Sequence, residues 1–400
     1  MTRGAEGPLS AVRACRLAAS ALFLGAALPA CGPPPAPPAP PLVVTAPPPA
    51  VTAAPTSLPD FALLRRPVVA PACGAPPTSE PGPISAGFLE VTLPAKTPAI
   101  VDVEGRDDRD VWLLAGESSS GQTFLHWDGA TVSEERVPCH SGWERSLVVT
   151  PTELLSFGLS NGDMPEDQLA RRSASGVWSC PEGDRAWLDV PIGVEMLRFR
   201  SHRPPVLGGQ TVALPDLGAH DNDVPPPAMA ARASEDVWLA SRTTPSVLHW
   251  NGLVWEDRSP GLPWIQSLHI AANGVVWIAG GVGPSPREWM FRSKGREHAK
   301  REGNSVLRWD PAAQAWVCLP TPAGLYTEHV RGVSDHEVWL IGGEEVYYWD
   351  GESFQRGVTP TPDPMDAWLS PAGELWLAGG KDSKSSGAGV VFRTRAGRKP

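Results

Sequence analysis

The chain has 400 residues and a formal net charge of −10 at pH 7, with 46 prolines, 40 glycines and 17 tryptophans but only three tyrosines. Its acidic and basic residues are interspersed, which argues against a nucleic-acid-binding protein and suits a soluble exported one. The density of glycine and proline leaves no long stretch with a 3.6-residue apolar period, so an α-helical fold is disfavoured.

Residues 1–30 have the features of a secretory signal peptide. Three arginines precede an apolar stretch, Leu17 to Leu28, that is too short to cross a bilayer as a permanent helix. The segment ends in Leu-Pro-Ala-Cys-Gly, which resembles a bacterial lipobox and implies cleavage before Cys31 and lipid attachment to its thiol. We therefore expect a membrane anchor at Cys31 and a location in the bacterial cell envelope, on the outer membrane or facing the periplasm. The alternative is an ordinary signal peptide with an incidental cysteine.

Residues 31–80 form the lipidated cysteine and a linker rich in proline and alanine. Such a composition favours polyproline II and cannot build a packed core, so the linker acts as a semi-rigid spacer. Residues 81–400 remain for the globular part, which a closed ring of repeats can fill as one domain.

A repeat organises the chain from residue 88 to residue 395. Each unit contains an apolar run with a central tryptophan, a turn, and a second run that ends in Trp-Asp or Trp-Asn. The clear apolar runs centre on Trp112, Trp238, Trp277, Trp339 and Trp376. Degenerate copies are expected at Glu153 to Leu155 and near Met196, and spacings of about 40 residues then predict seven units.

Each unit is predicted to contain four short β-strands, because its runs are rich in Val, Trp, Ile and Leu and are bounded by Gly, Pro, Asn and Asp. Asp128-Gly129, Asn251-Gly252 and Asp350-Gly351 are expected to be type I′ hairpin turns, in which both central residues have positive φ. Four strands in about 40 residues are typical of a propeller blade. The sequence therefore predicts an all-β, seven-bladed β-propeller, with six or eight blades as the alternatives.

The last unit ends after its third strand, and the stretch before the first unit supplies a fourth. Phe88 to Leu93, followed by Pro94, has the pattern of the fourth strands elsewhere in the chain. We predict that this stretch completes the last blade and closes the ring, which removes two exposed sheet edges.

The repeats resemble those of bacterial exported propellers of the form Asp-Val-Trp…His-Trp-Asp-Gly, which are loosely similar to kelch and WD repeats. Double glycines typical of kelch units occur at Gly280-Gly281, Gly342-Gly343 and Gly379-Gly380, whereas Ser241-Arg242 take their place in another unit. The resemblance implies an exported lipoprotein with a propeller fold and leaves its ligand open.

Most tryptophans are expected to pack between blades, because 12 of the 17 fall on repeat positions. Trp143 and Trp264 lie off these positions, in stretches expected to be loops that lead into a first strand. They are candidates to stack on a sugar or a peptide.

No cofactor or metal site is predicted. His126 and His249 occupy one repeat position where other units carry arginine or tyrosine, which favours a structural role over a ring of metal ligands. The segment His220 to Asp223 is interpreted as an acidic surface turn. The sequence contains no Gly-x-Ser-x-Gly, His-Glu-x-x-His or phosphate-binding glycine motif, so we predict that the protein is not an enzyme.

Export permits disulfides, and Cys73, Cys139, Cys180 and Cys318 allow three pairings. The last three fall at about the same repeat position, the expected outer strand. The repeat positions favour a Cys139–Cys180 bridge between neighbouring blades and give less support to a Cys73–Cys318 bridge, and the sequence leaves the pairing open.

The segment Gly281 to Asn304 interrupts the repeat with six basic residues against three acidic ones. Its candidate binding residues are Arg287, Trp289, Arg292, Lys294 and Arg296. Long loops on a rigid scaffold often carry function, so we expect this insertion to bind an anionic partner. The alternative is a solvated hairpin tip.

Together these features predict a monomeric, lipid-anchored binding or scaffolding module that recognises a protein partner through loops on one propeller face. A propeller that binds carbohydrate or cell wall is one alternative. A hydrolase or lyase whose dispersed site leaves no motif is the other.

Overall fold

The computed structural model describes residues 71–75, 77, 80–84, 87–116, 123–137, 144–150, 152–158, 169–180, 188–192, 195–200, 203–207, 210–211, 228–233, 235–240, 246–281, 304–361, 363–381 and 387–395. The chain divides into two compact units, Met1–Thr56 and Ser57–Pro400, and all of these residues belong to the second. The predicted signal peptide, Cys31 and most of the predicted linker lie outside them. A search of the described residues finds no helix that could span a membrane.

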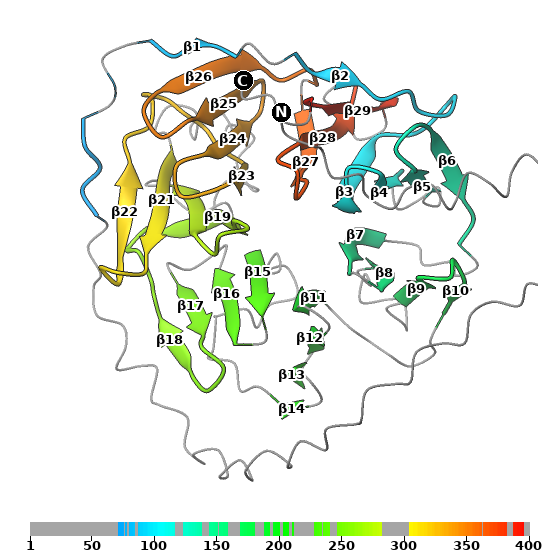
Figure 1. Ribbon diagram of the computed structural model, residues 1–400, viewed down its shortest axis with the longest axis horizontal. Coiled ribbons are helices and arrows are strands. Elements are labelled where there is room, and N and C mark those ends of the chain that lie inside the picture. The colour runs from blue at the N-terminus through cyan, green and yellow to red at the C-terminus, as the bar shows by residue number, and fades with distance from the viewer. Residues whose placement is uncertain are drawn as a thin grey trace, which may run out of the picture. The chain divides into compact units, whose positions relative to one another are not determined.

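The described strands form seven sheets (Figure 1). The strands that follow pair antiparallel and in chain order within each sheet, and two short N-terminal strands, described below, join the outer edges of the last two sheets. The first sheet comprises β3 Ile100–Asp107, β4 Asp110–Ala115, β5 Thr123–Trp127 and β6 Val132–Glu135. The second comprises β7 Glu144–Val149, β8 Glu153–Gly158, β9 Leu169–Ser173 and β10 Trp178–Ser179. The third comprises β11 Leu188–Ile192, β12 Glu195–Arg200, β13 Arg203–Leu207 and β14 Gln210–Thr211. The fourth comprises β15 Ala228–Ala233, β16 Asp236–Ala240, β17 Val247–Trp250 and β18 Trp255–Asp257. The fifth comprises β19 Trp264–Ile270, β20 Val276–Gly281, β21 Asn304–Asp310 and β22 Ala315–Leu319. The sixth comprises β23 His329–Gly332, β24 Val338–Gly342, β25 Glu345–Trp349 and β26 Phe354–Val358. The seventh comprises β27 Asp363–Leu369, β28 Leu375–Gly380 and β29 Gly389–Arg393.

The tryptophan-centred runs are the second strands of their sheets. Every residue of β20, β24 and β28 is buried, because a strand packed between two neighbouring sheets is covered on both faces. The degenerate copies expected at Glu153 to Leu155 and near Met196 are β8 and β12, also second strands. Nine repeat-position tryptophans are buried, as predicted: Trp112, Trp127, Trp238, Trp255, Trp277, Trp309, Trp316, Trp339 and Trp376.

The first strands of successive sheets contact one another in a series that returns to its start. β3 contacts β7, and the contacts continue through β11, β15, β19, β23 and β27, which contacts β3. The chain is therefore an all-β propeller, as the sequence predicts.

Hydrogen bonds between first strands reinforce this series at β-bulges. In each case a polar side chain at a bulge accepts a backbone N–H from the first strand of the next sheet. These bonds run from Leu147 N to Asp102 Oδ2 (2.5 Å), from Val103 N to Asp366 Oδ2 (3.0 Å) and from Val330 N to Ser267 Oγ (3.1 Å). A bulge turns one side chain out of the regular alternation of the strand. Here that side chain bonds to the first strand of the next sheet and so joins the two sheets.

The closing strand predicted at residues 88–93 is confirmed. Strand β2, Leu89–Glu90, pairs antiparallel with β29, and Val91 N donates to Val391 O at 2.9 Å. A second short strand, β1 at Gly82–Pro83, adds to the other side of β26 in parallel orientation.

One of the two bridges considered from the sequence is present, and it is compatible with the other, the predicted Cys139–Cys180 bridge. Cys73 is bonded to Cys318 on β22, with Cα atoms 5.0 Å apart. Cys180 is also disulfide-bonded, but Cys139 lies outside the described residues, so Cys139–Cys180 remains a prediction. The bond also attaches Cys73 to the propeller, although the predicted domain boundary at residue 80 assigns it to the linker.

The predicted type I′ turns are wrong. Gly129, Gly252 and Gly351 have positive φ, but the Asp or Asn before each does not. Instead, that side chain accepts two backbone N–H groups, as Asp128 Oδ1 does from Ala130 and Thr131 at 2.8 Å each. The side-chain carboxylate or amide stabilises a longer loop, which the Asp-Gly and Asn-Gly dipeptides do not distinguish from a two-residue turn.

Candidate functional site

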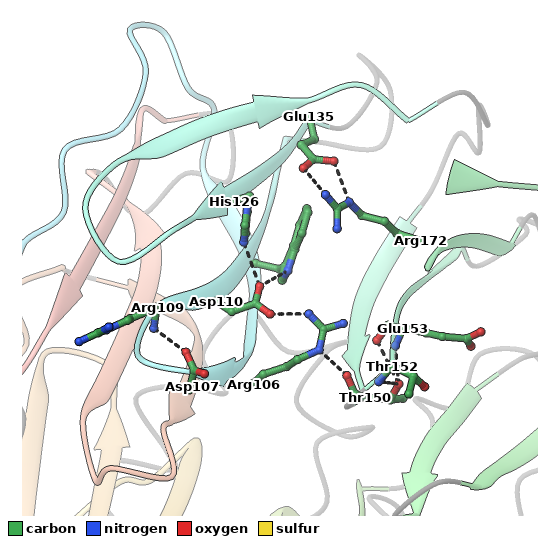
Figure 2. A network of polar contacts seen from close by, with 11 residues as sticks. Arg106, Asp107, Arg109, Asp110, His126, Glu135, Thr150, Thr152, Glu153 and Arg172 are labelled. Atoms are coloured by element: carbon green, nitrogen blue, oxygen red, sulfur yellow. Dashed lines mark hydrogen bonds and ion pairs between the residues drawn. The ribbon is translucent and has the colours of Figure 1, made fainter. Parts of the chain in front are cut away.

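The polar residues of the repeat form a compact cluster in the first sheet (Figure 2). Asp110 Oδ1 accepts hydrogen bonds from Trp112 Nε1 and His126 Nε2, both at 2.9 Å, and Asp110 Oδ2 pairs with Arg106. The His126 imidazole stacks on the Trp112 indole with centroids 4.2 Å apart. Burial acts to raise the pKa of Asp110, but the hydrogen bonds from His126 and Arg106 hold that pKa well below its usual range. An ionised carboxylate only accepts, so His126 donates to it.

The same cluster recurs in other sheets. Asp236 Oδ1 accepts from Trp238 Nε1 at 3.0 Å and from His249 Nε2 at 3.1 Å, and the two rings stack at 4.4 Å. In the sheet of β23–β26, Tyr348 packs on the corresponding tryptophan at 4.8 Å and is hydrogen-bonded to the glutamate two residues before that tryptophan. The two histidines therefore join second and third strands, which is the structural role that the sequence pattern indicates.

Arg172 on β9 connects the first sheet to the second (Figure 2). Its Nε and Nη2 donate to the two carboxylate oxygens of Glu135 at 2.9 and 2.8 Å, and its Cζ lies 4.8 Å from the Trp112 ring centroid. Trp178 Nε1 donates to the same carboxylate at 3.0 Å. A bidentate, partly buried ion pair fixes both partners in orientation, so the repeat residues make the scaffold rigid.

A second cluster, which we name the inner charged group, consists of Asp102, Glu104, His269, Arg331 and Asp366. They lie on the first strands of four consecutive sheets, β3, β19, β23 and β27. Arg331 Nε donates to Ala367 O at 2.5 Å and its Nη2 lies 3.4 Å from Asp366 Oδ1. The ring of His269 bonds through Nε2 to Gly332 O at 3.0 Å.

The inner charged group has strongly shifted pKa values. Burial, followed by repulsion from Asp366, raises the pKa of Asp102 well above its usual value and the pKa of Glu104 to about 8. Burial, followed by the Arg331 charge, lowers the pKa of His269 to about 3. At neutral pH Glu104 is therefore mostly protonated and His269 is neutral. Such shifts are frequent at functional sites. A search of the described residues finds no group of His, Cys, Asp or Glu that could hold a metal ion.

Solved structures with the same architecture are propellers. They include YCF48 bound to D1 peptide (14% identity, 79% of this chain, 100% of that chain, TM-score 0.53). Another is the WD40 β-propeller domain of Doa1 (12% identity, 78% of this chain, 98% of that chain, TM-score 0.53). A third is a catalytically inactive variant of virginiamycin B lyase from Staphylococcus aureus with quinupristin (11% identity, 77% of this chain, 99% of that chain, TM-score 0.51). No protein-family model matches the chain, and no curated protein sequence does either. At these identities the likeness shows the fold alone.

The prediction that Trp264 lies in a ligand-facing loop is wrong. Trp264 is the first residue of β19, its side chain is 1% exposed, and it pairs in register with Gly281 on β20. A Cβ on Gly281 would lie 2.1 Å from the Trp264 ring, so the glycine makes room for the indole. The indole therefore belongs to the core, and the carbohydrate-binding alternative loses one of its two tryptophans.

The remaining predicted binding residues lie outside the described residues: Trp143, Arg287, Trp289, Arg292, Lys294 and Arg296. Strand β20 ends at Gly281 and β21 begins at Asn304. The insertion therefore joins the second and third strands of one sheet.

The sequence gives no prediction of the inner charged group. Glu104 and Asp366 are far apart in the chain, and only closure of the first-strand series brings β3 beside β27. The available signal was the presence of charged residues inside short first strands, at positions that the apolar runs do not fill.

Proposed function

We propose that this protein is a non-catalytic binding module that recognises a protein partner and is held at the bacterial envelope by a lipid on Cys31. The observation that carries the proposal is the role of the repeated Asp, Trp and His residues. In the first and fourth sheets they satisfy one another's hydrogen bonds. Recognition is then left to residues that do not repeat, presented by a rigid scaffold.

The fold is compatible with peptide recognition, since YCF48, which has a similar structure, is bound to a D1 peptide. In this chain the non-repeating segment with a distinct charge is the insertion 281–304, which is basic in a protein of net charge −10. We infer that it contacts an acidic segment of the partner, because a local excess of opposite charge steers and orients association.

The experiment is capture from envelope extract with the lipid-free chain, followed by cross-linking and peptide mapping. We expect a retained protein to cross-link to residues 284–302, and deletion of 284–302 to abolish capture while thermal stability stays nearly unchanged. Undiminished capture by the deletion variant would remove the insertion from the proposal. A glycan array on the same material tests the carbohydrate alternative.

A second candidate function, a hydrolase or lyase, is favoured by the inner charged group. A glutamic acid with a pKa near 8 and a neutral imidazole, which both feel the charge of Arg331, are group types suited to general acid–base catalysis. One propeller of similar structure is virginiamycin B lyase. A broad hydrolase and lyase screen would detect activity, and only an activity lost in both Glu104→Gln and His269→Gln would support this candidate.

We also infer that the ring has seven blades, one for each sheet among the described residues. Support comes from the first-strand contacts, which pass through seven strands before β27 returns to β3. An experimental density map of the propeller, viewed along the first strands, would count the blades.

A further inference from the structure

A segment before the propeller repeats lies along the outermost strands of three consecutive sheets. We name its described residues, 71–75, 77, 80–84 and 87–91, the strap. Cys73 is bonded to Cys318 on β22, β1 pairs with β26, and β2 pairs with β29. Figure 1 shows β1 alongside β26 and β2 alongside β29.

The two strands of the strap are held very differently. At β2 the pairing is antiparallel, and Val91, only 5% exposed, packs in the core beside Trp376 and Val391. This part completes a four-stranded sheet and removes its open edge. It is therefore held by the core as well as by its hydrogen bonds.

Strand β1 is a fifth strand on a sheet that is already complete. It has two residues, Gly82 and Pro83, and proline has no N–H to donate. Its neighbour Ile84 donates to Arg356 O at 2.9 Å and packs over Gly357, where a Cβ would lie 3.0 Å from Ile84 Cδ1. So short a pairing is marginal by itself. The disulfide at Cys73 keeps it close to β26.

We propose that the Cys73–Cys318 disulfide sets the point at which the preceding chain leaves the propeller. With the bond intact this point is β22. Reduction by a dithiol supplies two electrons and two protons, so that the S–S bond breaks into two thiols and the dithiol becomes a disulfide. Residues 71–84 then detach as a unit, the exit point moves to the last sheet, and β2 stays in place. Cys73 is exposed, so a reductant can reach the bond.

The test is amide hydrogen exchange on the full chain without reductant, comparing the natural protein with Cys73→Ser/Cys318→Ser. Substitution is preferred to reduction because Cys180 is also disulfide-bonded and a reductant would break both bonds. We expect the Ile84 amide to exchange about tenfold faster or more in the double variant, and the Val91 amide to change by less than about twofold. Unchanged exchange at Ile84 would overturn the proposal. A joint rise at Ile84 and Val91 would also overturn it, because the strap would then not release separately from the closing strand.

Gly357→Ala provides a second variant in which the disulfide remains. The added Cβ displaces Ile84 while Cys73 stays attached, so we expect faster exchange at Ile84 and unchanged exchange at Val91. The effect should be smaller than that of the double serine variant, because the tether keeps a high local concentration of the strand near β26. An effect equal to or larger than that of the double variant would contradict a role for the bond in holding β1. Should the double variant not fold, a joint rise at Ile84 and Val91 in Gly357→Ala would overturn the proposal, because β1 would then not release separately from the closing strand.

Discussion

The imidazole of His126 lies nearly parallel to the indole of Trp112, at 15° and 4.2 Å between centroids, and both rings donate to the same oxygen of Asp110. His249 and Trp238 repeat this relationship at 23° and 4.4 Å. A histidine that recurs in a propeller suggests a ligand or a catalytic base. Here it is a packing element of the sheet.

Substitutions at His126 should show whether the position requires an aromatic ring stacked on Trp112. We expect His126→Ala to lower the free energy of unfolding by about 1–2 kcal/mol, because a stack and a hydrogen bond to an ionised carboxylate are lost. His126→Tyr should cost less than about 1 kcal/mol, since Tyr348 occupies the same position against Trp339. Urea unfolding measures both variants. Equal losses in the two would show that the stack contributes nothing.

Glu104 should make stability depend on pH. Its pKa is about 8 in the folded protein against an ordinary 4.5, so the folded state holds a proton that the unfolded state has released. The stability that Glu104 contributes is therefore present below about pH 4.5 and is lost as pH rises toward 8. Because glutamine stays neutral, we expect the free energy of unfolding of Glu104→Gln to rise relative to that of the natural protein by roughly 3–4 kcal/mol between pH 5 and pH 8. Unfolding at several pH values measures this, with the exposed Glu134→Gln as control; parallel curves for Glu104→Gln and the natural protein would refute the assignment.

His269 should act in the opposite direction. Its pKa is about 3 in the folded protein against an ordinary 6.5, so its stabilising contribution is present above pH 6.5 and is lost as pH falls toward 3. The stability deficit of His269→Gln relative to the natural protein should shrink as pH falls from 7 to 5. Thermal unfolding across this range checks it. A deficit that is constant with pH would mean that His269 does not titrate between the two states.

Gly281 should be intolerant of a side chain. A Cβ there would lie 2.1 Å from the buried Trp264 ring, so we expect Gly281→Ala to cost roughly 2 kcal/mol or more in unfolding free energy. Gly82→Ala, which meets no atom within 4 Å, is the matched control and should cost less than about 0.5 kcal/mol. A small cost at Gly281 would mean that Trp264 can move out of the core, and the ligand-stacking hypothesis would regain support.

The sequence predicts the second strands and the closing strand well, because consecutive apolar residues and the missing fourth strand are local signals. Other features depend on distant parts of the chain. Trp264 looks like a loop residue until its register partner Gly281 is known. The partner of Cys73 depends on the path of the strap, and the inner charged group depends on closure between β3 and β27. The turn type was missed for a local reason, because Asp128 stabilises its loop with its side chain.

The central claim is that residues outside the repeat recognise a protein partner. Its most direct test is the affinity of the captured partner for a variant in which Arg287, Arg292, Lys294 and Arg296 are changed to glutamine. The matched control neutralises four exposed basic residues elsewhere: Lys96, Arg109, Arg136 and Lys381. We predict that the first variant weakens binding by about tenfold or more, chiefly through slower association at low salt, and that the control changes it by less than about twofold. Equal effects of the two variants would contradict the account, because the insertion would then contribute only net charge.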